Sequence, residues 1–231
     1  MSIAENLNRL REEIAAACKT AGRSSEEVTL MAVSKTHPVS AILEAAAAGC
    51  TLFGENRVQE FEQKSAVRAD TSLRVHLIGP LQSNKAARAA ALFDGIDTLD
   101  SLKLALRLND AAAKLDKRLS VLLEIKLSHE ESKHGLLPGS QDLAELLERL
   151  PDLANLDIRG LMTIAPLGED PRPCFRQLRR LREELSKQNP RLNLRELSMG
   201  MSGDFAVAIA EGSTCVRIGT AIFGTRAGNA Q

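Results

Sequence analysis

The sequence predicts a single (β/α)8 TIM barrel, a closed ring of eight parallel strands inside a layer of helices, with an extra N-terminal helix. Short apolar runs alternate with longer segments of helical spacing, which is typical of βαβ units and a parallel sheet. Eight such runs fit within 231 residues, and a barrel typically needs about 250. The first run ends in "SKTHP" rather than a glycine-rich turn, which disfavours the alternative, an open doubly wound sheet.

Each element has its own sequence signal, and no linker divides residues 1–231, so we expect one domain. The extra helix is expected over residues 3–21, which are charged and amphipathic. The strands, each with an apolar interior, are expected at residues 28–35, 51–56, 74–80, 95–100, 120–128, 158–166, 194–200 and 215–224. The helices, rich in Ala, Leu, Glu and Arg, are expected at residues 38–49, 56–69, 83–93, 100–117, 141–150, 171–188 and 203–211.

Composition excludes several classes of protein. Lys+Arg and Asp+Glu number 30 each, which gives no reason to expect nucleic acid or an anionic membrane as a partner. No segment approaches the ~20 apolar residues that span a bilayer, and the start of the chain lacks the apolar core of a signal peptide. The four cysteines are scattered without a CxxC pair, so we expect no metal site, and free thiols in a reducing cytoplasm.

Polar residues gather where the predicted strands end, which is where barrels of this kind carry their chemistry. Lys35 follows the first strand and Asn56 the second, and Met162 ends the sixth. The seventh strand leads into "SMGMS", residues 198–202, and the eighth reads "VRIGT", residues 216–220. These ends, Arg217 among them, are expected to form one polar rim.

The loops after the last two strands have the composition of an anion site. Barrels often bind phosphate there, and Gly200 and Gly219 would let the backbone approach an anion closely. Ser202 and Thr220 would add hydroxyl donors, and Ser202 is also expected to be the N-cap of the helix at 203–211. The alternative is that Ser202 only caps its helix and the glycines only turn the chain.

Lys35 is a candidate nucleophile. Partial burial at the mouth of a barrel lowers the pKa of a lysine, and its neutral amine can then attack an aldehyde. Closure places the first strand beside the eighth, so this amine would lie close to the anion site. An aldehyde that also carries phosphate is pyridoxal 5′-phosphate (PLP). The alternative is a lysine at the rim with its ammonium in water.

Several motifs together resemble one family. They are "AVSKTHP", "FGENRVQE", "HLIGPLQSNK", "ESKHG", "GLMTIAP" and "LSMGMSGDFAVAIAEGSTCVRIGTAIFG". Over residues 3–224 the sequence resembles the pyridoxal-phosphate homeostasis proteins, which are similar to the N-terminal barrel of alanine racemase. The resemblance implies that PLP forms an aldimine with Lys35 and that the cofactor site comprises Lys35, Asn56, Met162, Ser198, Gly200, Ser202, Arg217, Gly219 and Thr220.

The resemblance also implies individual roles. Ser202, Gly219 and Thr220 would hold the phosphate, Arg217 would face the pyridine nitrogen, and Asn56 and Met162 would lie beside the ring. Lys133 in "ESKHG" is a second candidate amine. The sequence departs from the family around the fifth strand, where Lys126 and Leu127 stand in place of an expected Asn.

The predicted function is PLP storage, buffering or delivery with little or no catalysis. Arg217 cannot readily give up a proton, which argues against aminotransferase or decarboxylase chemistry. Racemisation needs two acid/base groups, and the tyrosine that alanine racemase draws from a second domain has no counterpart because the chain contains no Tyr. A slow amino-acid racemase that uses a histidine or water as its second base is the alternative. The candidate substitutes on the rim are His37, His129, His134 and Cys215.

Partners other than PLP are less defined by the sequence. We expect a cytoplasmic monomer that delivers PLP to PLP-dependent apoenzymes. The basic helix "FRQLRRLREEL", residues 175–185, is a candidate docking surface for such an enzyme, and the alternative is that it is the solvated outer face of a barrel helix.

Overall fold

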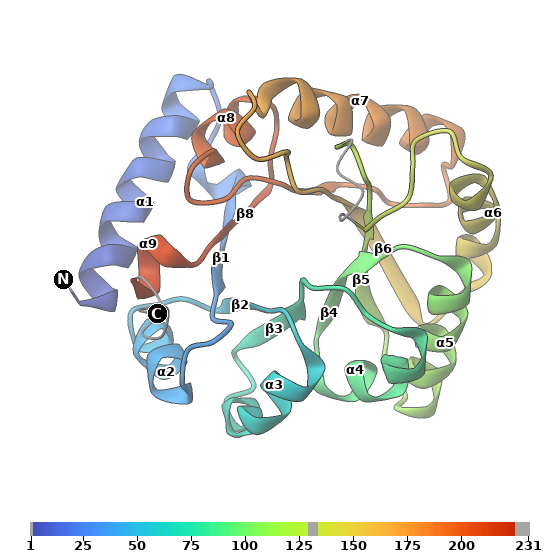
Figure 1. Ribbon diagram of the computed structural model, residues 1–231, viewed down its shortest axis with the longest axis horizontal. Helices are drawn as coiled ribbons and strands as arrows, with labels where there is room; N and C mark the ends of the chain where they lie inside the picture. Colours follow the sequence, from blue (N-terminus) through green and yellow to red (C-terminus); the bar gives the residue numbers. More distant parts are fainter. Residues whose placement is uncertain (1, 129–133, 225–231) are drawn as a thin grey trace.

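Eight parallel strands close into a barrel in a computed structural model of the chain, which describes residues 2–128 and 134–224 (Figure 1). In order round the barrel they are β1 (Thr29–Val33), β2 (Leu52–Glu55), β3 (Arg74–Leu77), β4 (Gly95–Leu99), β5 (Leu119–Glu124), β6 (Leu156–Met162), β7 (Glu196–Ser198) and β8 (Cys215–Ile218). β8 pairs with β1, with Leu30 opposite Val216 and Ala32 opposite Ile218. The predicted closed barrel is therefore confirmed, and the open sheet is wrong.

Helices cover the outside of the barrel (Figure 1). The α-helices are α1 (Ile3–Thr20), α2 (Val39–Ala47), α3 (Val58–Gln63), α4 (Ala86–Leu92), α5 (Leu102–Lys114), α6 (Gln141–Arg149), α7 (Arg172–Gln188), α8 (Phe205–Ala210) and α9 (Thr220–Phe223). Short 3-10 turns are η1 (Ser25–Glu27), η2 (Ser65–Ala69), η3 (Ser83–Lys85) and η4 (Leu150–Asp152). The helix predicted over 56–69 is thus divided into α3 and η2. Within the described ranges, no helix is both long and apolar enough to cross a bilayer.

Helix α1 is the extra N-terminal helix and lies beside the junction of β8 and β1. Ser2 and Glu5 form a reciprocal capping box at its start, which satisfies backbone donors that the helix itself leaves unpaired. Its buried face packs against α2, α8 and α9 (Figure 1). Asn6 Nδ2 also donates to the carbonyl oxygen of Ile222 in α9 at 2.9 Å. The helix therefore ties the end of the barrel to its beginning.

Several polar side chains lie inside the barrel. Asp97, Glu124, Ser198 and Arg217 are buried, although an apolar interior was expected for each strand. Side chains of a barrel strand alternate between the lumen and the helical layer. The apolar positions of these strands supply the core beneath the helices, which leaves polar side chains facing the lumen.

Candidate functional site

Most of the predicted site residues line a cavity of 360 Å³ at the carboxyl ends of the strands. Lys35, Asn56, Ser202, Arg217, Gly219 and Thr220 all line it. The remaining described wall residues are Val33, Ile78, Ile164, Met201 and Gly203. Lys35 and Thr220 come from opposite ends of the sequence and meet because β1 pairs with β8.

Gly219 makes this junction possible. A Cβ at this position would lie 3.2 Å from the backbone oxygen of Val33 and 3.4 Å from its Cβ, which is closer than most side chains tolerate. The absence of a side chain lets the segment after β8 pass against the end of β1. Lys35 and Thr220 consequently line the same cavity.

A buried ion network holds the turn that carries Lys35. Lys64 Nζ donates to the carbonyl oxygen of Ser34 at 3.0 Å and to Glu55 Oε1 at 2.9 Å. The Ser34 hydroxyl also donates to Glu55 Oε1, at 2.7 Å. Burial raises the pKa of Glu55, and the hydrogen bonds from Lys64 and Ser34 oppose that rise. Sequence reasoning missed Lys64, because its position in α3–η2 does not reveal that it reaches beneath β1.

The residue after Lys35 has an unusual backbone. Thr36 has a φ of 66°, a left-handed conformation that is uncommon for residues other than glycine. Its N–H donates to Glu60 Oε1 at 2.5 Å, and Lys64 Nζ donates to the same oxygen at 2.8 Å. Burial would raise the pKa of Glu60, but the hydrogen bonds from Lys64 and Thr36 outweigh it and lower that pKa. The network thus supports a strained turn at the predicted nucleophile.

Arg217 is buried rather than on the rim, so the expectation of an exposed position is wrong. Its Nη1 donates to the Ser198 hydroxyl and its Nη2 to the Thr163 carbonyl oxygen, each at 2.8 Å. Its backbone N–H donates to the carbonyl oxygen of Gly200 at 2.9 Å. Burial lowers the pKa of Arg217, but a guanidinium keeps its proton in proteins. Arg217 therefore presents a fixed positive charge to the cavity.

Three predicted site residues lie behind the cavity wall. Met162 and Ser198 are buried partners at the ends of β6 and β7, and Ser198 supports Arg217. Gly200 has a φ of 97°, and a Cβ there would lie 2.6 Å from that of Ala208. Their cofactor contacts stay predictions, and their observed contacts are structural.

The predicted cap at Ser202 is wrong. Helix α8 begins at Phe205 and its N-cap residue is Asp204. The Asp204 carboxylate accepts a hydrogen bond from the Met201 N–H at 2.5 Å. Ser202 is exposed and lines the cavity, so its hydroxyl is available to the site and does not cap the helix. A Cβ at neighbouring Gly203 would meet nothing within 4 Å.

Glu124 is a titratable residue that sequence reasoning did not select. It lines an adjoining cavity of 170 Å³ that shares Asn56, Ile78 and Ile164 with the Lys35 cavity. Burial, then the charge of Asp100, raises the pKa of Glu124 to about 7, while Arg217 opposes the rise. The sequence feature that could have identified it is a charged residue within the largely apolar run "SVLLEI".

The candidate second bases are dispersed. Cys215 lines a cavity at the opposite end of the barrel, where burial raises the pKa of its thiol to about 12, so its selection was wrong. The ring of His37 stacks on Phe223 with centroids 4.9 Å apart. His134 is exposed beside the smaller cavity, which Lys126 also lines. His129 and Lys133 lie outside the described residues.

The donors in the Lys35 cavity fit a phosphorylated aldehyde. An amine can bond covalently to a carbonyl carbon. The hydroxyls of Ser202 and Thr220, with the accessible backbone at Gly203 and Gly219, can hold an anion. Arg217 lines the same cavity and adds a charged donor. The arrangement suits a ligand with a carbonyl group and a phosphate at its two ends.

Comparison with known proteins agrees with this arrangement. The alanine racemase N-terminal domain family matches residues 5–227. Pyridoxal phosphate homeostasis proteins of Haemophilus influenzae and Escherichia coli K12 are 44% and 46% identical, covering 98% and 97% of this chain and 97% of each relative.

Solved structures show the same relationship. PipY of Synechococcus elongatus, with PLP bound, is 44% identical and superposes with a TM-score of 0.85, covering 96% of this chain and 100% of PipY. Alanine racemase of Clostridium difficile shares the fold at 17% identity, with a TM-score of 0.72 that covers 99% of this chain and 58% of that one. The chain belongs to the family of the pyridoxal phosphate homeostasis proteins, whose barrel is that of the alanine racemase N-terminal domain.

Proposed function

We propose that this protein binds PLP and serves intracellular PLP homeostasis by storing, buffering or delivering the cofactor. The observation that carries the proposal is that Lys35 and the hydroxyls of Ser202 and Thr220 line one cavity across the β1–β8 junction. The names of the relatives and the PLP in the PipY structure support it.

Each wall residue has a role in this proposal. The Lys35 amine bonds to the cofactor aldehyde, while Ser202, Gly219 and Thr220 hold the phosphate. Arg217 donates a hydrogen bond to the pyridine nitrogen without transferring a proton. The cofactor supplies an electrophilic carbonyl carbon and a ring that can take up electrons.

The remaining predicted residues shape the site. Asn56 and Met162 limit the space beside the ring, and Ser198 and Gly200 fix Arg217 through its side chain and backbone. We assign all of residues 1–231 to one cofactor-binding domain, working as a cytoplasmic monomer that delivers PLP to apoenzymes.

We expect little or no catalysis, because the cavity has few groups that can transfer protons. Among the described residues that line the Lys35 cavity, Lys35 is the single amine, and none has a carboxylate, imidazole, thiol or phenol side chain. Racemisation requires a second such group on the other face of the substrate. Glu124, whose pKa lies about 7 in the adjoining cavity, is the observation that keeps a slow racemase as the second candidate.

Lys35→Ala tests the binding proposal. Purified wild-type protein should absorb as a lysine-bound PLP, and borohydride reduction followed by mass mapping should place the label on Lys35. The absorbance should disappear in Lys35→Ala and persist in the control Lys126→Ala, which alters the adjoining cavity. PLP attached equally well in Lys35→Ala would refute the assignment.

The racemase alternative has its own test. Holoprotein incubated with L-alanine in deuterated water should show neither α-deuterium uptake nor D-alanine at useful rates. If turnover does occur and Glu124→Gln abolishes it, the protein is an enzyme and the carrier proposal fails.

The basic helix at 175–185 uses some of its arginines for contacts within the protein. It forms part of α7, where Arg176 donates to the buried Glu211 at 2.9 Å and Arg172, at the start of α7, donates to it at 3.1 Å. Arg179 lies 3.6 Å from the same carboxylate. These charges pack α7 against α8, in keeping with the alternative of an ordinary outer helix. Docking of an apoenzyme there stays a prediction.

A further inference from the structure

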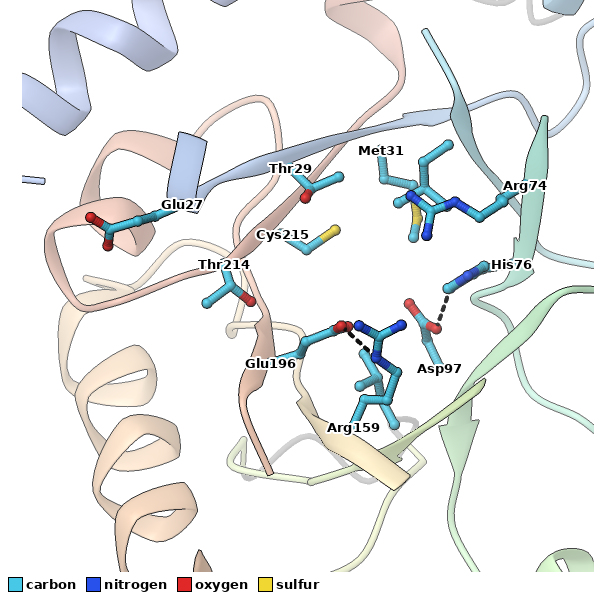
Figure 2. A pocket seen from close by; sticks show the side chains of 12 residues that line it. Glu27, Thr29, Met31, Arg74, His76, Asp97, Arg159, Glu196, Thr214 and Cys215 are labelled. Carbon is cyan, nitrogen blue, oxygen red and sulfur yellow. Dashed lines mark hydrogen bonds and ion pairs between the residues drawn. The ribbon is translucent and has the colours of Figure 1, made fainter. Parts of the chain in front are cut away.

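A second cavity opens at the other end of the barrel, where the strands begin. It measures 260 Å³ (Figure 2). Several of its wall residues are the first residues of their strands, namely Thr29, Leu52, Arg74, Glu196 and Cys215. Lys35 and Thr220 are at the opposite end, so this cavity is separate from the proposed cofactor site.

Charged side chains enter this cavity from several strands. Figure 2 shows Arg74, Asp97 and Glu196 pointing into it from three sides. Two pairs are already formed: Arg159 Nε lies 2.8 Å from Glu196 Oε1, and His76 Nδ1 lies 2.9 Å from Asp97 Oδ1. These pairs fix the geometry of the wall.

Among the described charged residues of this wall, Asp97 keeps one oxygen and Arg74 its guanidinium without a partner. Asp97 is 1% exposed, and its second oxygen, Oδ2, makes no hydrogen bond with any described residue. Arg74 stands at the exposed mouth, and its guanidinium makes no hydrogen bond or ion pair with any described residue. A buried carboxylate oxygen without a partner is costly. The cavity thus has one unsatisfied acceptor inside and one free cationic donor at its entrance.

The size and charge of the cavity restrict what fills it. A water molecule takes about 30 Å³ of liquid volume, so 260 Å³ is far too large for one ion or water. An anion bound to Arg74 would face the Asp97 carboxylate, and a cation at Asp97 would face Arg74. A molecule carrying both charges satisfies both groups. Met31, Leu52 and Leu122 add an apolar wall for a short hydrocarbon side chain.

We propose that this cavity binds a free amino acid with a small apolar side chain, its ammonium at Asp97 and its carboxylate at Arg74. The binding is reversible and involves no covalent step. It gives the barrel a ligand site at the amino ends of its strands, independent of the cofactor site at their carboxyl ends.

Calorimetric titration of the full-length holoprotein with L-valine tests the proposal. Isobutylamine and 3-methylbutanoate are the matched half-ligands, because each keeps the side chain and one of the two charges. We expect L-valine to bind at least about tenfold more tightly than either half, as charge-assisted hydrogen bonds at both ends imply. No binding of L-valine, or equal binding of a half-ligand, would overturn the proposal.

Variants identify the site. Arg74→Gln alters an exposed side chain, so the fold should survive, and L-valine affinity should fall at least about tenfold. Asp97→Asn should cause a similar loss, with thermal unfolding measured to show that it folds. Arg118→Gln is the control, because Arg118 pairs at the surface with Asp157 and does not line the cavity.

Lys35→Ala separates this site from the cofactor site. We expect L-valine to bind this variant as it binds the wild type, whether or not PLP is retained. Binding that disappears in Lys35→Ala and persists in Arg74→Gln would show that L-valine reacts with the cofactor instead, and the proposed site would be refuted.

Discussion

Arg217 shows how a single side chain links the barrel interior to the proposed cofactor. Its guanidinium holds Ser198 and the Thr163 carbonyl oxygen with two separate nitrogens, a fork that an ammonium cannot reproduce. Because the residue is buried, substitution affects stability as well as the site.

Arg217→Lys should therefore weaken both the stability of the fold and the binding of PLP. We expect it to lower the free energy of unfolding by roughly 1–3 kcal/mol, the cost of leaving a buried polar partner unsatisfied, to shift the PLP absorbance and to loosen PLP binding. Urea denaturation and a PLP titration measure these effects. Arg118→Lys, at an exposed pair, should alter none of them. An unchanged absorbance in Arg217→Lys would contradict the role at the pyridine nitrogen.

The buried carboxyl group of Glu124 should make the stability of the protein depend on pH. Burial and the charge of Asp100 raise its pKa to about 7, so the folded state holds this proton between pH 4.5 and 7 where the unfolded state has lost it. Its contribution to stability therefore falls as pH rises through that window. Glu124→Gln should stabilise the protein at pH 8, by about 3 kcal/mol at most, and much less at pH 5. Urea denaturation at the two pH values measures this.

Glu211 is a control, because its contribution to stability should change with pH in the opposite direction to that of Glu124. Hydrogen bonds from Arg176 and Arg172 lower its pKa, against the effect of burial. Its stabilisation is therefore present at neutral pH and is lost as pH falls through the lowered pKa. Glu211→Gln should destabilise the protein at pH 7, with an effect that shrinks in acid. If both variants gave the same pH trend, the assigned environments would be wrong.

At the scale of elements, α3 supports the end of β1. Lys64 joins Glu55 and the Ser34 carbonyl oxygen, and with Glu60 it holds Thr36 in its left-handed conformation. Breaking a buried ion pair from one side costs about 3–5 kcal/mol. Lys64→Met should lower the free energy of unfolding by about this amount, as measured in urea.

Glu60→Gln tests the same turn with a smaller expected loss of stability than Lys64→Met. It weakens the contacts to Thr36 while leaving Lys64 and Glu55 paired, so we expect faster PLP release with little loss of stability. Glu62→Gln is the matched control on α3, because its surface partner is Arg88. Equal PLP release rates in wild type, Glu60→Gln and Glu62→Gln would show that this network does not position Lys35.

Much of the architecture was predictable from alternation alone. The order of strands and helices, the closure, and α1 follow from apolar periodicity, because burying those faces admits few arrangements. The convergence of Lys35, Asn56, Ser202 and Thr220 follows in turn from closure.

Apolar periodicity does not predict whether a polar side chain within an apolar segment faces the lumen, the helices or solvent. Arg217 and Glu124 face the lumen and are buried there, whereas rim exposure was expected for the first and no role was assigned to the second. Asp204 displaced Ser202 as cap because the chain makes a further turn after β7 before α8 begins. Lys64 reaches Ser34 across 30 residues, a contact that depends on tertiary packing and not on local sequence.

At the scale of the whole molecule, the site depends on the junction where the last strand meets the first. Gly219 allows close approach on the inside, and α1 covers the outside (Figure 1). There the Asn6 side chain donates to the carbonyl oxygen of Ile222, two residues after Thr220. α9 is only one turn long, so its position relies on such external contacts. PLP retention should therefore be sensitive to a residue far from the cavity in sequence.

Asn6→Ala tests this dependence. Losing one partly buried hydrogen bond costs about 1 kcal/mol, which corresponds to a PLP affinity about fivefold weaker if the whole cost appears as mobility of Thr220. Transfer of PLP to an added apoenzyme should speed up in proportion. Asn8→Ala is the control, since the Asn8 side chain accepts a hydrogen bond from Arg11 on the exposed face of α1. If Asn6→Ala lowered the unfolding temperature but left PLP release unchanged, α1 would stabilise the barrel without tuning the site, and the phosphate contact would have to lie away from α9.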